Sequence, residues 1–122
     1  MKRIRQIHFY LGVLFAPMII IFALSGALQT FRLQDAPKNG GTYTPPAWIV
    51  RLADFHKDQR PAHGAGVRRS LPLQWFVVLM SVGLIGSTIL GIVLAFKLTR
   101  DKRVVLGLIV LGFAIPLGLL YL

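Results

Sequence analysis

The stretch IHFYLGVLFAPMIIIFALSGAL, residues 7–28, decides the fold of this chain. It contains no Asp, Glu, Lys or Arg, and it follows the cations Lys2, Arg3 and Arg5. A helix of about 20 apolar residues crosses the hydrocarbon core of a bilayer. Lipid offers no hydrogen-bond partners to the backbone, so a spanning segment pairs its own backbone groups as a helix. A signal peptide has a shorter apolar region of about 7–15 residues. We therefore interpret this stretch as a membrane-spanning helix.

Two more apolar runs follow, at residues 71–96 and 104–122. The sequence thus predicts an all-α integral membrane protein, one domain over residues 1–122, with spans at about 7–31, 71–97 and 104–122. The remaining segment, residues 32–70, is too short for a soluble domain with a sizeable core. We expect it to form an extracytoplasmic loop.

Part of this loop has helical periodicity. Ile49, Leu52, Ala53 and His56 recur on one face. The charged residues fall largely off that face: Arg51, Asp54, Lys57 and Asp58. This pattern predicts a short amphipathic helix that lies in the headgroup zone of the membrane.

The net charge of +10 is concentrated in the connections between the apolar runs. Seven cations lie in two short segments, residues 2–5 and 97–103, and seven more are spread over the longer loop. The positive-inside rule weighs short segments close to the spans. It predicts a bacterial inner-membrane protein with a cytoplasmic N-terminus and an extracytoplasmic C-terminus. Anionic lipids are expected partners, and nucleic acid is not, because no basic stripe is interleaved with aromatic residues.

Small residues recur every four positions in the second span, at Gly83, Ser87, Gly91 and Ala95. This spacing places them on one helix face, where another backbone can approach closely. Two interpretations stay open. The face packs against another span of the same chain, or it docks a separate subunit.

Residues that carry catalysis or ion transport are scarce. No Asp, Glu, Lys or Arg lies deep in a span, and proton relays and ion pathways depend on such residues. The chain has no Glu, no HExxH or GxSxG motif and no cysteine, which excludes thiolate metal sites and covalently attached haem. We expect no catalytic residues, no metal site and no enzyme, at most an electron-transfer component.

The histidines are the remaining candidates for binding. His8 precedes Gly12 by one helical turn, an arrangement that suits a flat macrocycle ligated by imidazole. The alternative is a histidine that hydrogen-bonds at the membrane interface. His56 and His63 belong to the extracytoplasmic loop, about 30 Å of hydrocarbon away from His8. His8 and His56 therefore cannot ligate one haem iron within a single chain.

Several short motifs resemble those of a known family. His8-Phe9-Tyr10-Leu11-Gly12, with Ser25-Gly26-Ala27-Leu28 at the far end of the span, resembles the first span of PepSY-associated transmembrane proteins. The stretches at residues 52–57 and 90–94 are similar to later elements of that family. The likeness is to a short, three-span member without the PepSY domain. It implies b-type haem, as in ferric-siderophore reductases, with His8 and His56 at the ligand positions.

Three hypotheses follow. The preferred one is a non-catalytic accessory subunit of a larger respiratory or photosynthetic membrane complex, packed against other integral subunits. The second is a haem b electron carrier, in which His8, Gly12 and His56 contact haem or a pigment carried by a partner. The third is a protein of iron homeostasis that binds metal at His56 and His63, where no carboxylate pair completes a site.

Overall fold

The structure is a computed structural model that describes residues 1–61, 66 and 68–122. Within that part of the chain it is all-helical. Four helices occur in the order α1 (Lys2–Thr30), α2 (Ala47–Asp58), α3 (Leu71–Leu98) and α4 (Lys102–Leu120). Among the described residues, α1, α3 and α4 are long and apolar enough to cross a membrane. The amphipathic segment predicted in the loop forms the helix α2.

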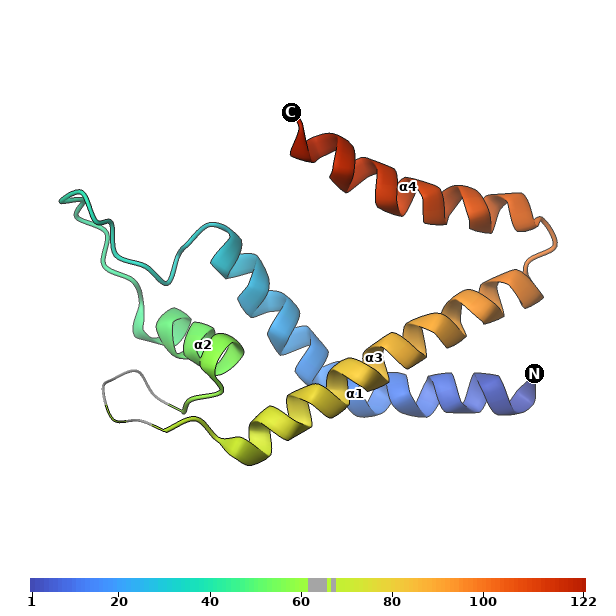
Figure 1. Ribbon diagram of the computed structural model, residues 1–122, viewed down its shortest axis with the longest axis horizontal. Coiled ribbons are helices and arrows are strands. Elements are labelled where there is room, and N and C mark those ends of the chain that lie inside the picture. The colour runs from blue at the N-terminus through green and yellow to red at the C-terminus, as the bar shows by residue number, and fades with distance from the viewer. Residues whose placement is uncertain (62–65, 67) are drawn as a thin grey trace.

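The helix ends follow local sequence signals. Ser70 caps α3, its hydroxyl accepting a hydrogen bond from the Leu73 amide at 3.3 Å, and Pro72 lies in the first turn. Asp101 caps α4 in the same way, through the Arg103 amide at 3.0 Å. The helices α3 and α4 therefore join through a connection of three residues, 99–101, and Figure 1 shows that α4 turns back from this connection and diverges from α3 along its length.

Helix α1 is the centre of the packing. It contacts α3 and α2, whereas α4 contacts α3. Figure 1 shows that α1 changes direction near its middle, and Pro17 lies inside this helix. Proline removes one helical hydrogen bond and commonly produces such a bend. The two halves of α1 thus face different partners.

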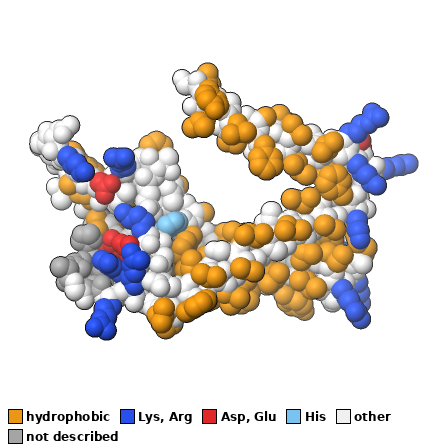
Figure 2. All heavy atoms as spheres, viewed as in Figure 1, with side chains coloured by type: hydrophobic (Ala, Val, Ile, Leu, Met, Phe, Trp, Pro, Cys, Tyr) orange, Lys and Arg blue, Asp and Glu red, His pale blue; other side chains and the backbone are white. Residues whose placement is uncertain are grey.

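Most apolar side chains of the long helices point outward. Figure 2 shows a broad hydrophobic band over α1, α3 and α4, with Lys and Arg gathered at both ends of it. Only a few side chains are buried, among them Phe15 of α1, Met80 and Leu94 of α3 and Val105 of α4. An apolar exterior between two charged ends is what a helix bundle surrounded by lipid requires.

Helix α2 differs from the sequence expectation at one residue. Ile49 and Ala53 are buried as its apolar face predicts, but Asp54 is buried as well, with 7% of its surface exposed. The buried part of α2, which packs against α1, therefore extends beyond the four-residue apolar stripe. Arg51 and Lys57 remain exposed.

Candidate functional site

His8 joins α1 to α3. Its Nδ1 lies 2.8 Å from the backbone carbonyl oxygen of Ser87 and 3.1 Å from the Ser87 hydroxyl. A carbonyl oxygen can only accept a hydrogen bond, so Nδ1 is the protonated ring nitrogen and donates. In the neutral ring, Nε2 then carries the lone pair. This tautomer is the one that a backbone carbonyl imposes on metal-ligating histidines.

The glycine next to the His8 ring is Gly91 of α3, not Gly12. A Cβ atom added to Gly91 would lie 3.3 Å from His8 Cε1, so a larger residue here would require the imidazole to shift by a few tenths of an ångström. A Cβ atom added to Gly12 would meet nothing within 4 Å. Gly12 therefore borders open space one turn beyond His8.

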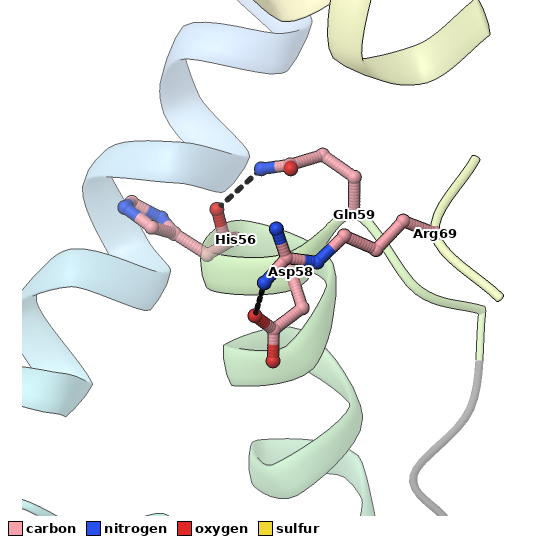
Figure 3. A network of polar contacts seen from close by, with 4 residues as sticks. All are labelled: His56, Asp58, Gln59 and Arg69. Atoms are coloured by element: carbon pink, nitrogen blue, oxygen red, sulfur yellow. Dashed lines mark hydrogen bonds and ion pairs between the residues drawn. The ribbon is translucent and has the colours of Figure 1, made fainter. Parts of the chain in front are cut away.

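His56 joins α2 to α1. Figure 3 shows its ring pointing from α2 toward α1, where Nδ1 lies 2.5 Å from the Ser25 hydroxyl. The Ser25 hydroxyl donates its single proton to the Phe22 carbonyl oxygen at 3.0 Å, so it accepts from His56. The His56 ring also packs on the Phe22 ring, with centroids 4.7 Å apart. His56 thus has the same tautomer as His8, with Nε2 left for another partner.

The backbone at His56 and the end of α2 are connected to the segment that leads into α3. The Gln59 amide nitrogen donates to the His56 carbonyl oxygen at 3.0 Å, and Arg69 forms an ion pair with Asp58 at 3.1 Å (Figure 3). The Ser70 amide donates to the Gln59 carbonyl oxygen at 3.0 Å. Together these contacts connect the end of α2 to the start of α3 and hold the His56 backbone in place.

The small-residue face of α3 lies against α1 over most of its length. A Cβ atom added to Gly83 would overlap the ring of Phe15, Ser87 hydrogen-bonds His8, and Gly91 lies beside the same imidazole. Ala95 borders a groove between α3 and α4 instead. The small residues of α3 therefore make room for the Phe15 and His8 side chains of α1, and in this way the face packs within the chain.

The two histidine contacts are far apart. Their anchor points on α1, His8 and Ser25, are 17 positions apart in the sequence. At 1.5 Å per residue this is about 26 Å along the helix. His63 lies outside the described residues, so its pairing with His56 stays a prediction. Among the described residues, no three His, Cys, Asp or Glu side chains gather as metal ligands do.

Sequence reasoning missed the partners of the histidines. Ser25, with 2% of its surface exposed, was noted only as part of the motif at residues 25–28, and Phe22 had no assigned role. One signal was present, because a hydroxyl in a span needs a hydrogen-bond partner, which can be a side chain of another helix. Phe15 carried no comparable signal, since any of the large side chains in this span could have faced α3.

No family model, curated protein or solved structure matches this chain.

Proposed function

We propose that this chain is an integral, non-catalytic subunit of a larger bacterial membrane complex of respiratory or photosynthetic energy conversion. The observation that carries this proposal is how unevenly the helices are covered. The contacts of His8, Phe15 and Ser25 join α1 to α3 and to α2. In contrast, Val105 is the buried residue of α4, and the rest of that helix is open to lipid or to another subunit.

The backbone of α4 supports the same proposal. Gly107, Gly112 and Gly118 would each accept a Cβ atom with nothing within 4 Å. Glycine costs helix stability compared with alanine, and in membrane helices it is enriched where another backbone approaches. A helix of a partner subunit that packs on α4 would use these positions.

We place this subunit in the inner membrane with the N-terminus in the cytoplasm. The end of the molecule that holds residues 2–5 and 97–103 is rich in Lys and Arg, and Asp101 is the one acidic residue in these two segments. That end carries a net charge of +6, and the loop end, with three Asp residues, carries +4. The denser positive charge favours the cytoplasmic side. Helix α2, with Trp48 exposed and Arg51 and Lys57 outward, would then lie at the outer headgroups.

Gentle extraction tests the proposal. Tagged chain is solubilised from its native membrane in a mild detergent and separated by size exclusion, with absorbance recorded for protein and for the haem Soret band. A subunit elutes with a much larger assembly at fixed stoichiometry, and His8→Ala leaves that association intact. Elution as a small, colourless particle under several mild detergents would contradict the proposal.

A second candidate function is a haem b electron carrier of the kind that the PepSY-associated proteins suggest. The observation that favours it is the tautomer shared by His8 and His56, which leaves Nε2 of each ring able to ligate iron. When bound, haem b supplies one-electron transfer. The two histidine contacts are made at His8 and Ser25, about 26 Å apart along α1. A second axial ligand would therefore have to come from another chain.

Haem loading separates the two candidates. The purified full chain is titrated with haemin and the Soret band is recorded for the wild type, His8→Ala and Ser87→Ala. A ligand role predicts that His8→Ala loses the band and regains it with added imidazole. Ser87→Ala should keep the band, since the carbonyl that orients His8 remains. Equal binding by wild type and His8→Ala would rule out His8 as the ligand.

A further inference from the structure

A groove of about 460 Å³ lies between α3 and α4, next to the turn that joins them. We call it the α3–α4 groove. Its volume is in the range of pockets that hold organic ligands, about 300–1,000 Å³. Its walls are largely apolar, and they include Gly91, Ile92, Ala95, Val105, Leu108 and Ile109.

The Thr88 hydroxyl, in the wall of the groove, is already bonded within its own helix. Thr88 Oγ1 donates to the Leu84 carbonyl oxygen at 2.8 Å. Its proton is therefore not available to an occupant. The interior thus matches a hydrocarbon chain better than a polar molecule, because an occupant with polar groups would lose hydrogen bonds to water there.

The turn beside the groove is strongly basic. Lys97, Arg100, Lys102 and Arg103, which we call the basic turn, are exposed and stand out at this end of the molecule (Figure 2). The one acid among them, Asp101, accepts the hydrogen bond that caps α4. Within the described part of the chain, none of the four cations forms an ion pair. Their charge is therefore available to an anionic group.

We infer that the α3–α4 groove binds one acyl chain of an anionic phospholipid whose phosphate lies at the basic turn. The inference rests on the proposed insertion of the three long helices in a membrane. Charge decides between this occupant and a second, parallel copy of the chain. A copy would bring its own basic turn to the same place, and the two sets of positive charges would repel each other. A lipid phosphate instead neutralises the positive charge of the basic turn. Basic pockets between membrane helices commonly hold anionic headgroups.

Native mass spectrometry tests the site. Delipidated full chain in detergent is titrated with phosphatidylglycerol or phosphatidylcholine that carry identical acyl chains. Loss of a cation near the headgroup should weaken phosphatidylglycerol binding roughly fivefold, so Arg100→Gln/Lys102→Gln should weaken it about 25-fold. The matched control, Lys38→Gln/Arg68→Gln, removes the same charge from exposed positions at the opposite end, outside α2, and should leave the affinity within twofold.

A third variant tests the groove itself. Ala95→Leu fills it from the α3 side and should reduce lipid occupancy while the preference for phosphatidylglycerol is kept. Circular dichroism confirms that each variant is folded. Equal binding of both lipids, equal loss in the control pair, or a dimer that Ala95→Leu abolishes would each overturn the inference. Resistance of the chain to alkaline carbonate extraction is measured in parallel, so that a failure of membrane insertion is recognised separately.

Discussion

Replacing Gly83 by alanine places a methyl group where the Phe15 ring lies. The added Cβ atom would be 2.8 Å from Phe15 Cδ2 and 3.1 Å from Cζ, and nearer still to Cε2. Non-bonded carbon atoms prefer 3.5–4.0 Å. The ring cannot move freely, because Phe15 has 4% of its surface exposed and packs against Phe76, with centroids 6.3 Å apart. The α1–α3 contact must therefore widen.

Gly86 provides a matched control on the same helix. A Cβ atom there meets nothing within 4 Å. Both substitutions remove a helical glycine, which by itself would stabilise the helix by up to about 1 kcal/mol. The overpacking at Gly83 costs about 1–3 kcal/mol. We therefore expect the free energy of unfolding of Gly83→Ala to be about 1–3 kcal/mol lower than that of Gly86→Ala.

Reversible unfolding by SDS in mixed micelles, followed by far-UV circular dichroism, measures this difference. The double variant Phe15→Leu/Gly83→Ala completes a thermodynamic cycle, and its coupling energy should be about 0.5–3 kcal/mol, because the smaller side chain makes room for the methyl group. Equal stability of the two alanine variants, with no coupling to Phe15, would refute the packing of Phe15 on Gly83.

Three further predictions use the same unfolding assay. Ser25→Ala leaves the partly buried Nδ1–H of His56 without its acceptor and should cost about 1–3 kcal/mol. Ser81→Ala, whose hydroxyl bonds within its own helix, should cost less than about 0.5 kcal/mol. Ser70→Ala removes the cap of α3 and should cost about 0.5–2 kcal/mol, with Ser70→Gly costing only a few tenths. Arg69→Ala breaks a partly exposed ion pair and should cost at most about 1 kcal/mol, and less at high salt; a larger loss would mean that this contact organises the whole loop.

The sequence was sufficient to predict the four helices, because their signals are local. Apolar runs of span length and the periodicity around Ile49 do not depend on what packs where. The small-residue spacing from Gly83 onward likewise predicted a face for close approach. It left the partner open, since the same glycines fit a helix of this chain or of another one.

The contacts of the histidines could not be predicted. Gly12 was the expected neighbour of His8 because it is one turn away on the same helix, but the imidazole reaches across to Gly91 and to the Ser87 carbonyl oxygen. These partners depend on the relative axial position of α1 and α3, and no local sequence pattern indicates that position. The burial of Asp54 was not predicted either, because its position on α2 lies off the apolar stripe.

The partners of the two histidines become available at different times during synthesis. Ser25 and His56 are 31 positions apart, whereas His8 and Ser87 are 79 positions apart. Chains grow at about 5–20 residues per second, so Ser87 follows His8 by roughly 4–16 s. A nascent chain that ends near residue 60 already contains Phe22, Ser25 and Gln59, the residues that hold His56. The residues that hold His56 are therefore all synthesised before α3, whereas His8 obtains its α3 partner only after residue 87 has been added.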